Sequence, residues 1–290
     1  MSALGAAKAS NSEEVSGDFV LTDANFRFFC KLANGHTGIV LNDAKRQMIY
    51  SRLVRRIRAL KLDGFDAYCK RLEAGDQAEF VEFINAITTN LTAFFRENHH
   101  FEHLRNIVMP QLMEAHAADR RIRIWSAGCS TGEEPYSLAI TIAETIPNID
   151  TWDVRILATD VDTNVLAKAA SGVYEDKRVE GVKREYLQRW FMRGTGEQAG
   201  SVRLREEVRS LISFKQLNLM NEWPMRGPFD VIFCRNVVIY FDKPTQTKLF
   251  NRYADLMVPR GHLYIGHSEN LFKVSDRFTP LGQTIYQRCK

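Results

Sequence analysis

From about residue 120 onward, short apolar segments alternate with helical segments, and this alternation restricts the fold more than any other feature of the chain. The predicted strands read RIRIWSAG, DVRILATD, ISFKQLNL, PFDVIFCRN and GHLYIGH. The predicted helices read EPYSLAITIAETI, DTNVLAKAASG and KPTQTKLFNRYADLM. Such alternation predicts an α/β fold, in which helices cover both faces of a parallel sheet. Ligands of these sheets bind at the carboxyl ends of the strands, where the winding reverses.

Two intervals depart from this alternation. Between Gly172 and Leu211 lie about 40 residues, many more than a crossover connection needs. Within them, SVRLREEVRSLISF alternates like an antiparallel strand. We therefore predict an inserted β-subdomain at about residues 175–215. The last apolar segment, FTPLGQTIYQRC, follows no crossover helix, so we expect it to pair antiparallel at the edge of the sheet.

The first part of the chain, residues 21–103, has helical periodicity and no convincing strand. The segment TDANFRFFCKLA opens with Thr22 or Asp23 as a plausible N-cap. Further helices are predicted in DAKRQMIYSRLVRRIRALKL, GFDAYCKRLEAG and AEFVEFINAITTN. We predict a disordered lead over residues 1–18, a helical domain with its linker over 19–103, and the α/β domain over 104–290.

Composition and charge argue against a secreted protein and against a membrane protein. The 290 residues are 45% hydrophobic and 26% charged, and the net charge of +4 is too small to imply a polyanion partner by itself. The five cysteines are scattered without a CxxC pair, which is typical of a reducing cytosol. No signal peptide and no apolar run of about 20 residues is present, so we expect a cytoplasmic protein without membrane insertion.

The segment WSAGCSTGEEPYSLAI, residues 125–140, predicts a strand, a turn and a helix with Pro135 in its first turn. Gly128 and Gly132 would let the backbone approach a ligand closely. Their spacing fits neither the dinucleotide pattern GxGxxG nor a P-loop, because no GK[ST] follows. The turn therefore argues against a triphosphate or a pyrophosphate ligand.

Two acids indicate the ligand that such a turn would bind. Asp160 ends the second strand, where an acid accepts hydrogen bonds from ribose hydroxyls. Glu134 at the helix start would repel a pyrophosphate and attract a sulfonium or ammonium group. S-adenosylmethionine is a nucleoside with such a positive charge. The alternative for Asp160 is that it caps the next helix, a role it could share with Asp162.

Several longer segments resemble the chemotaxis receptor methyltransferases of the CheR type. They are residues 88–97, 125–140, 158–174, 191–196, 227–242 and 266–270, which follow in order along the chain. The resemblance implies a helical N-terminal domain joined to a class I, Rossmann-like methyltransferase domain that carries a small inserted antiparallel β-subdomain. It also implies methylation of glutamates on the cytoplasmic domain of chemoreceptors, with S-adenosylmethionine as cofactor and S-adenosylhomocysteine as product.

The resemblance also implies particular site residues. By matching position, the cofactor contacts would be Asn90, Thr92, Arg96, Glu134, Asp160, Asn218, Leu219, Arg235 and Asn236. The amide of Asn218 can meet the adenine edge with a donor and an acceptor, unless it only turns the chain. For catalysis, Arg96 could grip the substrate carboxylate and Tyr240 could donate a hydrogen bond to it. Core packing is the alternative for Tyr240.

A basic helix suggests the partner. Residues 45–61 contain seven Lys and Arg and no acid, and Arg52, Arg55 and Arg56 share a face. A face of one sign favours an acidic partner over a merely solvated surface. The resemblance points to the acidic methylation region of the receptor, although charge alone would also admit nucleic acid. In some relatives the insertion binds a C-terminal receptor peptide by strand addition, and the RGTG turn, residues 193–196, matches them.

Two other functions compete with receptor methylation. A nucleic-acid methyltransferase would suit the basic helix, but the [DN]PP[YFW] word that holds a base is absent, and the corresponding place reads RNVVIY. A non-catalytic receptor-binding module is the other rival function.

In HHFEH, His99 and His103 lie one helical turn apart without a third ligand, so we expect no metal. Cys129 and Cys234 are assigned packing roles. We expect a monomer without a nucleic-acid partner.

Overall fold

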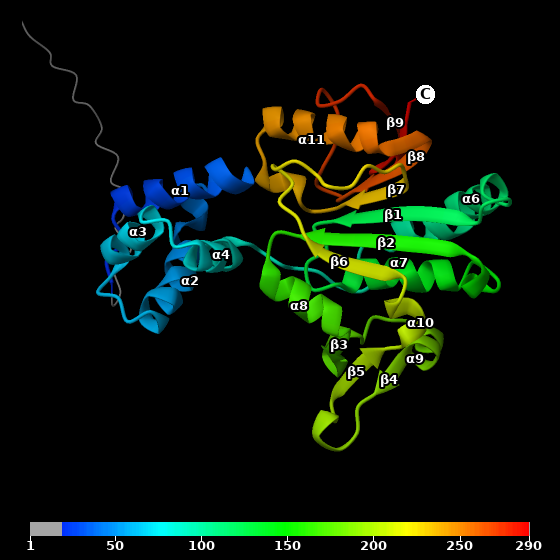
Figure 1. Cartoon of the computed structure of the whole chain (residues 1–290), viewed down its shortest axis with the longest axis horizontal. Helices are drawn as coiled ribbons and strands as arrows, with labels where there is room; N and C mark the ends of the chain where they lie inside the picture. Colours follow the sequence, from blue (N-terminus) through cyan, green and yellow to red (C-terminus); the bar gives the residue numbers. More distant parts are fainter. Residues whose placement is uncertain (1–18, 290) are drawn as a thin grey trace, which may run out of the picture. The chain divides into compact units, whose positions relative to one another are not determined.

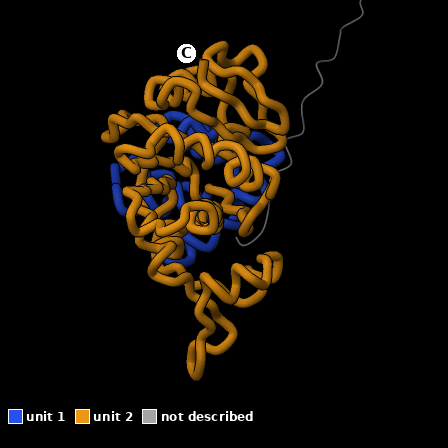
Figure 2. Tube along the Cα trace, turned by 90° about the vertical axis from the view of Figure 1, so that its right-hand side faces the viewer, with its two compact units in different colours: residues 1–87 blue, residues 88–290 orange. Residues whose placement is uncertain are grey.

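The structure is a computed structural model that describes residues 19–289, so the predicted disordered lead lies outside the described residues. Its helices and strands are labelled in Figure 1. The chain separates into two compact units between Ile87 and Thr88 (Figure 2). Each unit is described by itself below.

The first unit is helical, as predicted. Its elements are α1 (Asp23–Thr37), a 3-10 turn (Asp43–Lys45), α2 (Arg46–Ala59), α3 (Phe65–Glu73) and α4 (Gln77–Ile87). Thr22 is the N-cap of α1, because its hydroxyl accepts from the N–H of Asn25 at 3.2 Å and the Asn25 side chain accepts from the N–H of Thr22. The helices pack around Phe29, whose ring lies 6.0 Å from that of Tyr68 and 5.7 Å from that of Phe83.

The second unit is built on a seven-stranded sheet with the order β6-β2-β1-β7-β8-β10-β9. The five strands from β6 to β8 are parallel, and β10 and β9 pair antiparallel at the edge, as the sequence predicts. The strands are β1 (Arg121–Ala127), β2 (Asp153–Asp160), β6 (Ile212–Gln216), β7 (Phe229–Cys234), β8 (Met257–Ile265), β9 (Phe278–Gly282) and β10 (Ile285–Arg288).

The winding of the sheet reverses between β1 and β7. From β1 the chain proceeds to β2 and β6 on one side, and it then returns to β7 and β8 on the other side of β1. The carboxyl ends of β1, β2, β6 and β7 therefore share one edge, which we call the carboxyl edge. A ligand site is expected at such a reversal.

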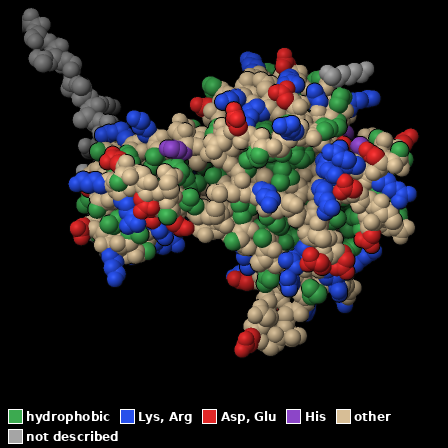
Figure 3. Space-filling view, in the orientation of Figure 1, with side chains coloured by type: hydrophobic (Ala, Val, Ile, Leu, Met, Phe, Trp, Pro, Cys, Tyr) green, Lys and Arg blue, Asp and Glu red, His purple; other side chains and the backbone are tan. Residues whose placement is uncertain are grey.

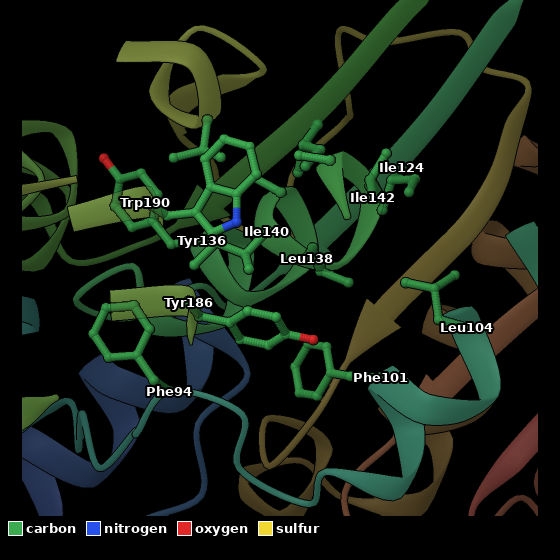
Figure 4. Packing of buried hydrophobic residues seen from close by; sticks show 14 of the residues in the cluster. Phe94, Phe101, Leu104, Ile124, Tyr136, Leu138, Ile140, Ile142, Tyr186 and Trp190 are labelled. Atoms are coloured by element: carbon green, nitrogen blue, oxygen red, sulfur yellow. The ribbon is translucent and has the colours of Figure 1, made fainter. Parts of the chain in front are cut away.

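Helices cover both faces of this sheet. They are α7 (Glu133–Ala143), α8 (Thr163–Ser171) and α11 (Lys243–Leu256). On β1, Ile124 packs in the cluster that contains Leu138 and Ile140 of α7 (Figure 4). The neighbouring residue Trp125 points to the opposite face, where its ring lies 5.2 Å from that of Tyr253 in α11.

The chain enters the second unit through residues 88–98 and a helical segment. This segment consists of α5 (His99–His103), a π-helical turn (Leu104–Val108) and α6 (Met109–Ala115). Phe101 and Leu104 are buried in the same cluster as α7. Within residues 19–289, no helix combines the length and the apolar character that a membrane crossing requires.

The insertion forms a second, three-stranded antiparallel sheet with the order β3-β5-β4. Its elements are β3 (Val173–Glu175), a 3-10 turn (Asp176–Arg178), α9 (Arg184–Trp190), β4 (Phe191–Arg193), a 3-10 turn (Gly196–Gln198), β5 (Ser201–Leu204) and α10 (Glu206–Arg209). The segment SVRLREEVRSLISF is thus not one continuous strand. Its middle forms α10, and its end begins β6, which pairs parallel with β2 in the large sheet.

Candidate functional site

The turn after β1 requires both of its glycines. Gly128 and Gly132 have φ of 87° and 97°, which side chains rarely adopt. A Cβ on Gly128 would lie 2.3 Å from Cγ2 of Val237. The N–H groups of Gly128 and Cys129 both donate to the carbonyl of Thr159, at 2.8 and 2.9 Å, which fixes the turn against the end of β2.

Asp160, at the end of β2, faces this turn. Its Oδ2 accepts from the N–H of Ser130 at 2.8 Å, and its Oδ1 accepts from the N–H of Asp162 at 3.0 Å. Burial raises the pKa of Asp160 to about 6, although the backbone N–H groups oppose the shift. The cap of α8 is Asp162, which accepts from the N–H groups of Asn164 and Val165. Asp160 is therefore not the helix cap.

The Ser130 hydroxyl is a second polar group beside Asp160 that a ligand could bind. Ser130 is 8% exposed, and its Oγ has no hydrogen-bond partner in the described part of the chain. A buried hydroxyl without a partner is costly, so a ligand that supplies one would be stabilised here. The hydroxyl can donate and accept, while the Asp160 carboxylate accepts, and a ribose diol offers the matching groups.

Glu134, in the first turn of α7, is buried in an ionic cluster. One oxygen accepts from the Ser126 hydroxyl at 2.7 Å, and the other lies 3.1 Å from Nη1 of Arg235. The same guanidinium lies 3.2 Å from Glu97 and donates to the carbonyl of Arg96. Two carboxylates thus share one guanidinium, and Nε of Arg96 lies 4.0 Å from Glu97 as a second cation. The four side chains form an ionic cluster at the carboxyl edge.

The pKa values in this cluster follow from burial and from the guanidinium. Burial raises the pKa of Glu134, and the charge of Arg235 opposes the rise. Burial would also raise the pKa of Glu97, but a hydrogen bond from His267 and the charge of Arg235 lower it to about 2. Glu97 is therefore ionised near neutral pH.

Glu269 has a role that the sequence analysis did not assign. Its carboxylate accepts from the N–H groups of Gly266 at 2.6 Å, Asn236 at 3.1 Å and Ile239 at 3.3 Å. It thereby ties the loop after β7 to the loop after β8 and supports Asn236 at a φ of 59°. One sequence signal could have identified Glu269: it is an acid directly after GHS, at the end of a predicted strand.

The segment that enters the second unit is anchored near the same edge. Asn90 donates to Oδ2 of Asp162 at 2.8 Å. The carbonyl of Thr92 accepts from Arg178 at 3.1 Å, and Arg96 donates to the carbonyl of Leu91 at 2.8 Å. The structure therefore brings this segment to the end of β2 and to the start of the insertion.

The remaining predicted site residues of this unit lie in the loops after β6 and β7. Asn218 uses its Oδ1 to accept from the N–H of Met220 at 2.9 Å, so it also turns the chain. The carbonyl of Leu219 accepts from Arg252 at 2.7 Å. Tyr240 is half-buried and ends the 3-10 turn Val238–Tyr240.

The three arginines predicted to bind a partner belong to α2, in the first unit. Arg55 is exposed. Arg52 donates to the carbonyl of Ala86 at 3.1 Å, and Arg56 makes two hydrogen bonds of 3.1 and 2.6 Å to the buried carboxylate of Glu79. Figure 3 shows one face of this unit, on which Lys and Arg side chains are mixed with acidic ones. Part of the basic face is thus occupied by contacts inside the unit.

His99 and His103 make polar contacts inside the second unit. His99 contacts the carbonyl of Gln283 at 3.2 Å, and Nδ1 of His103 contacts the hydroxyl of Tyr264 at 2.9 Å. Among residues 19–289, no three His, Cys, Asp or Glu side chains form a group that could hold a metal ion. All five cysteines are free thiols. Burial raises the pKa of the two nearest the carboxyl edge, Cys129 and Cys234, which makes them poor nucleophiles.

Known proteins match both units. The family described as "CheR methyltransferase, SAM binding domain" matches residues 90–287, and "CheR methyltransferase, all-alpha domain" matches residues 24–88. The chemotaxis protein methyltransferase of Salmonella typhimurium is 49% identical over 275 residues, which is 93% of this chain and 92% of that protein. The protein of the same name from Escherichia coli is 46% identical over 275 residues, with the same shares of the two chains. Chemotaxis protein methyltransferase 2 of Pseudomonas aeruginosa is 49% identical over 253 residues, which is 86% of this chain and 88% of that protein.

Proposed function

The chain belongs to the CheR methyltransferase family, and on that premise we propose that it methylates glutamate side chains on the cytoplasmic domain of a chemoreceptor. The family and the relatives make it a methyltransferase with an S-adenosylmethionine-binding domain. The relatives are named chemotaxis protein methyltransferases, which supports a chemoreceptor as substrate and the cytoplasm as location. They give no support to a nucleic-acid methyltransferase or to a non-catalytic module.

One observation in the structure carries the proposal. At the carboxyl edge, Asp160 accepts from the N–H of Ser130 in the turn after β1, and Glu134, in the helix that follows this turn, pairs with Arg235 after β7. We propose that the cofactor is held there by Asn90, Thr92, Arg96, Glu134, Asp160, Asn218, Leu219, Arg235 and Asn236. When bound, S-adenosylmethionine supplies a methyl group on a positively charged sulfur, which a carboxylate oxygen displaces to give a methyl ester and S-adenosylhomocysteine.

The residues of the chain would then have to position the substrate. A glutamate with an ordinary pKa of about 4.3 is already ionised at neutral pH, so no general base is required. Arg96 would hold the carboxylate through its guanidinium, and the Tyr240 hydroxyl would donate a hydrogen bond to it. Both groups would replace water around the carboxylate and would hold it close to the methyl group in the orientation that transfer requires.

Two surfaces would recognise the receptor. Arg55 is the exposed cation of the predicted basic face and suits an acidic receptor helix, with Arg52 and Arg56 beside it in α2. In the insertion, β4 (Phe191–Arg193) is an edge strand of the small sheet and could add a receptor peptide as a further strand. The chain would act as a monomer.

A methyl-transfer assay tests the function. The chain is incubated with methyl-labelled S-adenosylmethionine and membranes that carry a chemoreceptor, and the expected result is label on the receptor that mild alkali releases as methanol. Receptors with aspartate at the methylated glutamates serve as the matched control and should take up little label. Label that resists alkali would show that the product is not a carboxyl ester and would overturn the proposal.

A further inference from the structure

Two side chains at the start of the insertion contact the turn after β1 and the first turn of α7. Tyr174, in β3, donates from its hydroxyl to the carbonyl of Thr131 at 2.7 Å. Arg178, in the following 3-10 turn, contacts the carboxylate of Glu133 and donates to the carbonyl of Thr92 at 3.1 Å. The two residues therefore connect the small sheet with both the turn after β1 and the segment that enters the unit.

Glu133 explains why Arg178 is needed. Its side chain is fully buried in the first turn of α7, and its Oε2 accepts from the Thr131 hydroxyl at 2.6 Å. A buried carboxylate is costly unless a cation and hydrogen bonds compensate it. Arg178 supplies the cation. Because the same guanidinium holds the Thr92 carbonyl, it links that segment to the start of α7.

Tyr174 packs directly against the glycine turn. Its ring lies 5.0 Å from that of Phe94 in an edge-to-face arrangement, and the residue is 1% exposed. A Cβ on Gly132 would lie 2.8 Å from the Tyr174 hydroxyl. The hydroxyl thus occupies the space that the glycine leaves open, and its hydrogen bond to Thr131 holds the turn in this conformation.

From these contacts we propose that Arg178 and Tyr174 are positioning residues for the cofactor site. They hold residues 131–133 and the backbone of Thr92 in one arrangement, so the affinity for S-adenosylmethionine depends on the insertion. Neither residue touches the reacting atoms. The inference rests on the proposed location of the cofactor at the carboxyl edge.

Calorimetric titration with S-adenosylhomocysteine tests the inference without catalysis. We expect Arg178→Met to raise the Kd at least about tenfold, the scale of a lost charge-assisted contact, and Arg178→Lys to recover part of the affinity. Arg184→Met is the matched control, because Arg184 is exposed at the start of α9 in the same insertion, and its Kd should equal that of the wild type. In steady-state assays, Arg178→Met should raise KM for S-adenosylmethionine and leave kcat at saturation unchanged.

Two further variants keep the test decisive if Arg178→Met is unstable. Tyr174→Phe removes a single hydroxyl and should raise the Kd about threefold. Glu133→Gln combined with Arg178→Met removes the unpaired charge, so it should restore the melting temperature while the Kd stays high. Folded variants with the wild-type Kd would overturn the inference. A wild-type chain that fails to bind S-adenosylhomocysteine would instead overturn the proposed cofactor site, and the inference with it.

Discussion

Arg235 and Glu134 form an ion pair of 3.1 Å at the carboxyl edge, between side chains that are 2% and 11% exposed. The sequence predicts both residues as cofactor contacts but does not predict that they contact each other. Glu97 shares the guanidinium and also lies 4.0 Å from Nε of Arg96, so the pair belongs to a cluster of two carboxylates and two guanidiniums. The role of Glu134 toward the sulfonium or ammonium group stays a prediction.

Replacing Arg235 should destabilise the second unit. Arg235→Met leaves the buried carboxylate of Glu134 without its cation, and removing one partner of a buried pair costs about 3–5 kcal/mol. Urea unfolding followed by tryptophan fluorescence measures this loss, since Trp125, Trp152, Trp190 and Trp223 are the four tryptophans of the chain and all belong to this unit.

A matched double variant identifies the cause. Arg235→Met combined with Glu134→Gln buries one charge fewer, so it should be more stable than Arg235→Met alone. Equal stability of the two variants would show that the ion pair with Glu134 is not what stabilises the wild type.

Cofactor binding should weaken in acid because of Asp160, whose pKa is raised to about 6. The ionised carboxylate is the form that accepts ribose hydroxyls, so the affinity for S-adenosylhomocysteine should be about tenfold lower at pH 5 than at pH 7. The stability of the free protein changes with pH in the opposite direction. The folded chain holds this proton more tightly than an unfolded Asp with a pKa of about 3.9, so this group destabilises the fold as pH rises toward 6.

Calorimetry across this pH range checks the assignment. Asp160→Asn should bind weakly at every pH and should lose the change between pH 5 and pH 7. If the variant kept that change, another group would be responsible for it.

Replacing Tyr240 should separate catalysis from cofactor binding. Tyr240→Phe removes a hydrogen bond to a charged carboxylate, which is worth about 1.5–3 kcal/mol, so turnover should fall by about tenfold to a hundredfold. The Kd for S-adenosylhomocysteine should not change. An unchanged turnover number would remove Tyr240 from the mechanism and favour a packing role.

Local patterns predicted most of the fold, and they missed contacts between distant segments and one very short helix. The strands around Trp125 and Asp160 and the cap at Thr22 follow from periodicity and capping chemistry, which neighbouring residues determine. The contact of Arg235 with Glu134 and that of Arg178 with Glu133 join distant segments, and only the folded topology brings them together. The helix α10 was missed because its four residues are too few to show a helical period.

The two neighbouring arginines of α2 should respond differently to substitution. Arg56 compensates Glu79, which is 3% exposed, so Arg56→Met should lower the stability of the first unit by about 3 kcal/mol. Arg55 is exposed, so Arg55→Met should leave stability unchanged but weaken methylation of intact receptor and flatten its dependence on salt. Far-UV circular dichroism in urea measures the first effect, and receptor methylation at increasing ionic strength measures the second. The exposed Lys61 lies beyond the C-terminal end of the same helix, and Lys61→Met serves as the control for loss of a positive charge alone. If Arg55→Met kept the wild-type salt dependence, the receptor would not dock on this face of α2.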